Sequence, residues 1–142
     1  MAIKPLRKEN LLEQKRQDKD HERIVSEMLE QFKPVFENSP DGVYLYLDDR
    51  HKVCNQKMAD LFGMSVDEWA AIPDFLGGFV VPQDQELVAR NFQEHVASLT
   101  RPALIRFRAK KKDGTIFTAE TEMIPISWDG HPVAYHFVRR VS

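Results

Sequence analysis

Residues 53–69 restrict the fold of this chain more than any other segment, because they predict two short helices directly after a strand. The first helix places three apolar residues at i, i+3 and i+4 on one face: Met58, Leu61 and Phe62. Gly63 then stands where a helix commonly ends in a left-handed residue. Ser65 and Glu68 have the spacing of a capping box, so a second helix begins there. The two helices must therefore pack at a fixed angle after the strand.

An amphipathic segment precedes this unit. Residues 1–23 are mostly charged, and from Ile24 onward apolar residues recur every three or four positions. Pro34 is expected to end or kink this helix near Phe32, because proline lacks the backbone N–H that a helix interior needs. The apolar stripe either covers its own domain or meets the same helix of a second chain, and the sequence leaves both open. In the second case the dimer interface consists of Ile24, Val25, Met28, Leu29 and Phe32.

Residue alternation and turn signals predict five strands: 43–47, 51–54, 103–110, 116–126 and 133–138. Asp-Gly pairs at 113–114 and 129–130 favour tight hairpins between the last three. Pro82-Gln83-Asp84 opens a longer helix before them, with Asp84 as its N-cap. We therefore expect an α+β fold. Its five-stranded antiparallel sheet has short helices on one face and the N-terminal amphipathic helix on the other.

The composition excludes several classes of function. A formal net charge of −2 over 142 residues offers no general attraction to nucleic acid or to an anionic membrane. The most apolar stretch, residues 75–81, is too short to span a bilayer, and residues 1–16 hold no apolar segment typical of a secretory signal. The single cysteine, Cys54, excludes an intrachain disulfide. A cytoplasmic protein without nucleic-acid or membrane partners is the expectation.

Five motifs, in this order and at these spacings, resemble those of the PAS domain family. They are Asn-Ser-Pro-Asp-Gly-Val at 38–43, Asn-Gln-Lys-Met-Ala-Asp-Leu-Phe-Gly-Met-Ser at 55–65, Val-Pro-Gln-Asp at 81–84, Lys-Asp-Gly-Thr at 112–115 and Phe-Val-Arg-Arg-Val-Ser at 137–142. The resemblance covers about residues 32–142, which makes residues 1–31 an N-terminal helical extension. Arg140 departs from the acidic residue that is usual in the closing motif.

The resemblance implies a sensory or interaction module of signal transduction. Its sheet would curl around a pocket closed by the internal helices. It also implies a homodimer formed through the N-terminal helix and the outer face of the sheet. The occupant of the pocket would be a small apolar or aromatic ligand, unless the module uses no ligand at all.

The same resemblance places residues in the pocket. Aligned with the family's last strand, Ala134, His136 and Val138 face inward. His136 either binds a ligand or titrates near neutral pH, or it is a core histidine satisfied by a neighbouring polar group. The predicted ligand-binding residues are Ile105, Phe107, Phe117, Thr121, Met123, His136, Leu61, Phe62, Val88 and Phe92.

Two cofactors of the family define an alternative function, a redox or light sensor that carries haem or flavin. Haem-binding relatives use a histidine early in the long helix, where this chain has Val88, which cannot bind iron. His95 lies two turns later and is the remaining candidate. Flavin-binding light sensors use a cysteine that residues 75–81 lack, so only flavin held without a covalent bond stays open. The cofactor is therefore unknown at this point.

Motifs typical of catalysis are missing from the sequence. The chain has no glycine-rich phosphate loop, no His-Glu-x-x-His pair, no paired cysteines for zinc and no Gly-x-Ser-x-Gly. A small enzyme on a cone-like α+β fold would need a buried acid or histidine dyad, for which His136 is the one candidate. We therefore predict no catalytic residues, no metal site and no enzymatic activity.

Overall fold

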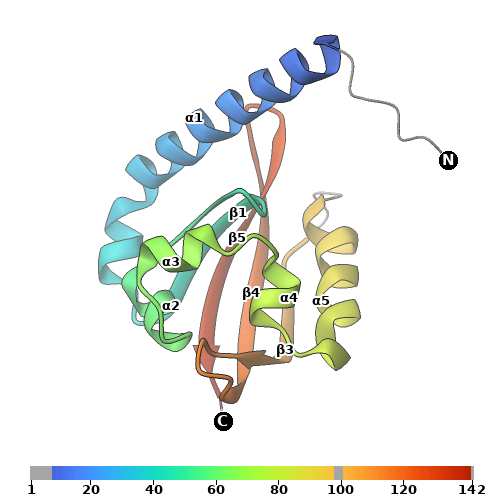
Figure 1. The fold of residues 1–142 in the computed structure, drawn as a ribbon. Coiled ribbons are helices and arrows are strands. Elements are labelled where there is room, and N and C mark those ends of the chain that lie inside the picture. The colour runs from blue at the N-terminus through green and yellow to red at the C-terminus, as the bar shows by residue number, and fades with distance from the viewer. Residues whose placement is uncertain (1–7, 98–100, 142) are drawn as a thin grey trace, which may run out of the picture.

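The computed structural model describes residues 8–97 and 101–141 as one sheet with helices on both faces (Figure 1). The strands are β1 (Gly42–Asp48), β2 (His51–Cys54), β3 (Ala103–Lys110), β4 (Ile116–Trp128) and β5 (His131–Arg140). The helices are α1 (Lys8–Asn38), α2 (Gln56–Leu61), α3 (Val66–Ala71), α4 (Phe75–Phe79) and α5 (Gln85–Asn91). A 3₁₀ turn, Pro82–Asp84, precedes α5, and a π-helical turn, Phe92–Ala97, follows it.

The sheet has the strand order β2-β1-β5-β4-β3, and all neighbours are antiparallel. β1 pairs with β5, so a strand near the N-terminus lies beside the last strand of the chain, and Tyr44 lies opposite His136. The β4–β5 hairpin turns at Asp129 and Gly130, which both have positive φ. The predicted α+β fold with a five-stranded antiparallel sheet is confirmed.

Each face of the sheet buries its own apolar cluster. Helices α2 to α5 cover the inner face and α1 lies along the outer face (Figure 1). Tyr44 and Tyr46 belong to the inner cluster, whereas Val43, Leu45 and Leu47 belong to the outer one, as the alternation along this strand predicted. The outer cluster is closed by α1, which contributes Ile24, Met28, Phe32, Val35 and Phe36.

Helix α1 does not end near Phe32, so this part of the prediction for Pro34 is wrong. Proline cannot donate a hydrogen bond to the carbonyl of Glu30, but both residues are exposed, and water can satisfy that carbonyl. Beyond the proline, Val35 and Phe36 pack against the outer cluster and hold the last turn in place. The axis of α1 changes direction in its last turns, drawn in cyan in Figure 1.

The same helix carries the predicted dimer interface and the predicted domain boundary. Ile24 and Met28 are buried against the sheet of their own chain, Val25 and Phe32 are half-buried, and Leu29 is 39% exposed. The boundary between residues 1–31 and 32–142 falls inside α1 and stays a prediction, and residues 1–7 lie outside the described part of the chain.

The two-helix unit that follows β2 forms as its sequence predicts. Gly63 has a φ of 69°, which suits the end of α2. The Ser65 side chain accepts a hydrogen bond from the Glu68 backbone, and the Glu68 side chain accepts one from the Ser65 backbone, so the capping box starts α3.

Asp84 occupies the N-cap position of α5, but its carboxylate makes no capping hydrogen bond within the described residues, contrary to the prediction. It accepts hydrogen bonds from the backbone N–H of Arg108 on β3 (2.7 Å) and from the guanidinium of that residue (3.0 and 3.1 Å). These charged hydrogen bonds lower the pKa of Asp84. A bidentate arginine is the stronger partner, so Asp84 ties the start of α5 to the edge strand instead.

Asn55 joins the end of α1, the start of β1 and the start of α2. Its Oδ1 accepts hydrogen bonds from the backbone N–H groups of Val43 and Met58, each at 2.9 Å. Its Nδ2 donates to the backbone carbonyls of Phe36 and Asp41, each at 3.2 Å. The predicted helix cap is therefore confirmed, and the same side chain also holds three segments together.

Replacing Asn55 by alanine should lower the free energy of unfolding by about 2–4 kcal/mol, because buried backbone groups lose their partners. Urea unfolding followed by circular dichroism measures the change. Asn38→Ala is the matched control, since its Nδ2 makes one exposed hydrogen bond, to Pro34, and its loss should cost about 0.5 kcal/mol or less. Equal losses in the two variants would contradict the role given to Asn55.

Candidate ligand pocket

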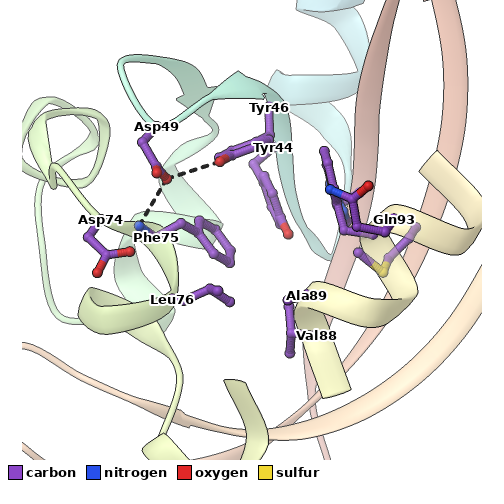
Figure 2. Close-up of a pocket in the computed structure, with 12 residues that line it drawn as sticks. Tyr44, Tyr46, Asp49, Asp74, Phe75, Leu76, Val88, Ala89 and Gln93 are labelled. Atoms are coloured by element: carbon purple, nitrogen blue, oxygen red, sulfur yellow. Dashed lines mark hydrogen bonds between the residues drawn. The ribbon is translucent and has the colours of Figure 1, made fainter. Parts of the chain in front are cut away.

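A pocket of about 250 Å³ lies between the inner face of the sheet and helices α4 and α5 (Figure 2). Strands β1, β4 and β5 form its floor, and α4, α5 and the π-helical turn form its walls. The lining side chains are mostly apolar or aromatic, with a few polar groups, as in typical small-molecule sites. They are Tyr44, Tyr46, Asp49, Asp74, Phe75, Leu76, Val88, Ala89, Phe92, Gln93, Met123 and His136.

The floor of the pocket is a stacked pair of rings, Tyr44 and His136. Because β1 pairs with β5 in this register, the two residues lie opposite each other, with ring centroids 4.0 Å apart and an angle of 5° between the ring planes. Burial raises the pKa of Tyr44. His136 is 1% exposed. The pair therefore presents polar atoms inside a mostly apolar site.

Neither ring nitrogen of His136 forms a hydrogen bond of normal geometry with any described residue. Burial lowers its pKa to about 3, and an interaction with the backbone of Ala134 opposes this only partly. The structure thus disfavours a core histidine fully satisfied by a neighbour, and burial opposes titration near neutral pH. The nearby Thr121 hydroxyl is also buried without a partner in the described chain. Each such group costs about 1–3 kcal/mol of stability. A ligand that hydrogen-bonds His136 would recover this cost there, whereas Thr121 does not line the pocket.

Asp49, in the turn between β1 and β2, stabilises the edge of the pocket where α4 begins, which we call the rim. One of its carboxylate oxygens accepts hydrogen bonds from the Tyr46 hydroxyl and from the Phe75 backbone N–H, each at 3.0 Å (Figure 2). Burial and the neighbouring Asp49 raise the pKa of Tyr46. The ring of Phe92 packs edge-on against that tyrosine, with centroids 5.5 Å apart. These contacts fix the start of α4 over the strands.

The structure brings four of the ten predicted ligand-binding residues to this pocket: Val88, Phe92, Met123 and His136. Five others are buried in the inner core beside it: Phe62, Ile105, Phe107, Phe117 and Thr121. Leu61 lines a different hollow, at the surface near the end of β5. Ligand binding by any of these residues stays a prediction.

Sequence reasoning missed most of the β1, α4 and α5 residues of the pocket. Tyr44 and Tyr46 carried a usable signal, since their alternation already placed both on one face of a strand. Asp49 and Asp74 carried none, because acidic residues in turns are normally solvated. Only the approach of α4 to the β1–β2 turn makes them part of a site.

The residues that line the pocket do not fit haem or flavin, the two cofactors of the alternative function. Val88 lines the pocket but cannot bind iron, and His95 is not among the lining residues. The volume lies below the roughly 300–1,000 Å³ of sites for drug-sized ligands, and haem and flavin are larger than most of those. Burial raises the pKa of the Cys54 thiol to about 12, so it is not a reactive thiolate.

Comparison with known proteins defines the class. Residues 51–139 match the family described as PAS fold, so the chain belongs to the PAS fold family. A search of curated protein sequences found no match.

The structure is similar to solved PAS domains and to domains of sensory proteins. One is the PAS domain of a protein from Colwellia psychrerythraea (TM-score 0.65, 21% identity, 80% of this chain and 97% of that one). Another is a domain of a sensory box sensor histidine kinase/response regulator from Geobacter sulfurreducens (0.61, 18%, 79% and 93%). A third is the PAS domain, in complex with ethanol, of a LuxR-family transcriptional regulator from Burkholderia thailandensis (0.60, 15%, 78% and 96%). At these identities the likeness shows a shared fold.

No helix in the described part of the chain combines the length and the apolar character that a membrane span requires.

Proposed function

We propose that this PAS domain is a cytoplasmic, homodimeric sensory module that binds a small molecule in the pocket of Tyr44 and His136. The ligand is mostly apolar, about the size of one ring, and carries a hydroxyl or another group that hydrogen-bonds His136. The module binds its ligand without catalysis. In this proposal the signal reaches a partner through α1, which covers the outer face of the same sheet.

The observation that carries the proposal is the unpaired His136 on the floor of a mostly apolar pocket. Most buried polar side chains in folded proteins have a hydrogen-bond partner, so one without a partner at a pocket is a candidate for binding a ligand. The pKa of about 3 keeps the imidazole neutral at physiological pH, so one nitrogen can donate and the other can accept. The ethanol complex of the Burkholderia PAS domain supports the size and polarity class, since that ligand is a small hydroxyl compound.

Phenol is a suitable probe, because it combines one apolar ring with one hydroxyl. Titration of isotope-labelled protein with phenol should move the ring signals of His136 in a saturable way, in the millimolar range. His136→Phe should weaken phenol binding by at least about tenfold, since it removes the hydrogen bond. Tyr135→Phe is the matched control, because Tyr135 directly precedes His136 in the same strand but packs in the outer cluster. Shifts spread over the surface without saturation, or equal binding by both variants, would overturn the proposal.

The homodimer is tested at Leu29, which is 39% exposed on α1. Leu29→Glu should convert a dimer into a monomer in sedimentation velocity, because a charge would be buried at the interface, while circular dichroism stays unchanged. Leu87→Glu on α5 is the matched control, since Leu87 is 40% exposed and lies outside the proposed interface. A wild-type chain that sediments as a monomer at micromolar concentration would show that the dimer does not form.

A further inference from the structure

A second cluster of polar side chains lies at the other side of the sheet, where α1 passes the β1–β2 hairpin. It consists of His21 on α1, Asp48 at the end of β1 and His51 at the start of β2. His131, the first residue of β5, packs edge-on against the ring of His21, with centroids 5.2 Å apart. Figure 1 shows α1 crossing near the tip of the β4–β5 hairpin. Three segments distant in sequence therefore bring histidines together.

The candidate ligand atoms of this cluster lie close enough together to bind one ion. The Nδ1 atoms of His21 and His51 lie 2.6 and 2.8 Å from the two carboxylate oxygens of Asp48. One ligand atom from each of the three residues lies within 4.8 Å of the others. In residues 8–97 and 101–141 these three form the one such group of histidine, cysteine, aspartate or glutamate.

Two neighbouring residues, Asp18 and Arg50, surround the candidate ligands. Asp18 places a carboxylate oxygen 4.0 Å from Nε2 of His51, the nitrogen on the far side of the ring. This distance is too long for a hydrogen bond, so Asp18 adds a negative charge near the site and does not fix the ring of His51. The backbone N–H of Arg50 donates to Asp48 at 2.9 Å and restricts the carboxylate. Asp48 is 40% exposed, whereas both histidines are largely buried, so an ion can enter from the side of the carboxylate.

We propose that His21, His51 and Asp48 bind one divalent transition-metal ion of the Zn²⁺ class. Two imidazole nitrogens and one carboxylate oxygen suit Zn²⁺, Co²⁺, Ni²⁺ and Cu²⁺, whereas Mg²⁺ and Ca²⁺ prefer oxygen ligands. Zn²⁺ has ligand distances of about 2.0–2.2 Å, so a tetrahedral ion would separate the nitrogen and oxygen atoms slightly more than the present hydrogen bonds do. The ion would bind the two Nδ1 atoms that now hydrogen-bond Asp48, so neither Nδ1 carries a proton when the ion is bound.

The metal site would add a cross-link where α1 already meets the sheet through apolar packing and hydrogen bonds, such as that between His21 and Asp48. One ligand comes from α1 and two come from the β1–β2 hairpin, so the bound ion cross-links the N-terminal helix to the sheet edge. Metal binding should therefore stabilise the docked position of α1.

The test uses the full chain without a histidine tag, stripped with a chelator. Titration with Co²⁺ should give one saturable equivalent and the strong visible absorption of a tetrahedral complex, and Zn²⁺ should displace it. His21→Gln and His51→Gln should each weaken binding by at least about tenfold, whereas His95→Gln, outside the cluster, should leave it unchanged. Hydrogen exchange of α1 amides should slow when Zn²⁺ is added.

Two results would overturn this assignment. One is a wild-type chain without saturable Co²⁺ or Zn²⁺ binding up to about 100 µM, well above the concentration at which a specific site fills. The other is a double variant, His21→Gln with His51→Gln, that binds with wild-type affinity. If the variants fold poorly, nitrogen-15 NMR spectra of the histidine side chains in the wild-type protein provide the test. Zn²⁺ must shift the signals of His21 and His51. Shifts confined to other histidines would exclude the site.

Discussion

Acidification from about pH 6.5 to about pH 5 should lower the free energy of unfolding by about 2 kcal/mol, and most of this loss should vanish in His136→Phe. In the folded protein burial lowers the pKa of His136 to about 3, whereas in the unfolded chain it has the ordinary value of 6.5. Between these values the unfolded state binds a proton that the folded state does not. Stability therefore falls as the pH drops below about 6.5, by about 1.4 kcal/mol per unit, and continues to fall towards about pH 3.

The variant should also change stability at neutral pH. Phenylalanine keeps a ring stacked on Tyr44 but removes two buried nitrogens without partners, so His136→Phe should be more stable than wild type by about 1–3 kcal/mol at pH 7. Urea unfolding at several pH values above 5 measures both effects, since carboxyl groups of the unfolded chain titrate lower, near pH 4. A stabilised variant that no longer binds phenol would show that His136 is kept for binding at the expense of stability.

Tyr135→Phe again serves as the control, because its neighbour His136 is unchanged there and the pH dependence should equal that of wild type. If the stability of His136→Phe depends on pH as steeply as that of wild type, protonation of His136 does not explain the loss of stability in acid. A His136 pKa near 6.5 in an NMR titration of the folded protein would also contradict the explanation.

The second large effect is expected at Trp69, where Trp69→Ala should lower the free energy of unfolding by about 3–5 kcal/mol. Trp69 is 0% exposed, and its ring stacks on Phe79 with centroids 5.3 Å apart. It also contacts the rings of Tyr44 and Phe75, both of which line the pocket. Alanine would leave a cavity between α3, α4 and the sheet, so the pocket rim should loosen as well.

Trp128 is the other tryptophan and provides the control. It is half-exposed, and its Nε1 donates to Glu27 on α1 at 3.0 Å. Trp128→Ala should therefore cost about 1 kcal/mol. Urea unfolding followed by circular dichroism measures the stability of both variants and does not depend on tryptophan fluorescence. Similar losses of stability in the two variants would contradict the large contribution of Trp69 to the inner core.

Local signals in the sequence were sufficient for the elements themselves. The capping box of Ser65 and Glu68 and the left-handed Gly63 act over three or four residues, so no distant partner changes them. The alternation of apolar residues assigned the strand faces, because neighbouring side chains of a strand must point to opposite sides. Together with the motif order, these signals predicted the PAS fold, which is confirmed.

The tertiary structure decided every outcome that depends on partners distant in sequence. Pro34 stays inside α1 because the next residues pack on the sheet. The Asp84 carboxylate accepts hydrogen bonds from Arg108 and does not cap its own helix. Sequence reasoning could place His136 on the inner face, but its missing hydrogen-bond partner appears only when the opposing strand and helices are in place.

The same reason explains why the His21, Asp48 and His51 cluster escaped motif analysis. Metal motifs are recognisable when ligands have short, regular spacing on one element, whereas here one ligand lies 27 residues before the next. The chain alone therefore determined its helices, strands and family. Only the packing of the fold decided which residues line the pocket and which histidines lie side by side. The reason is that hydrogen bonds and metal sites depend on proximity in space and not on order in the sequence.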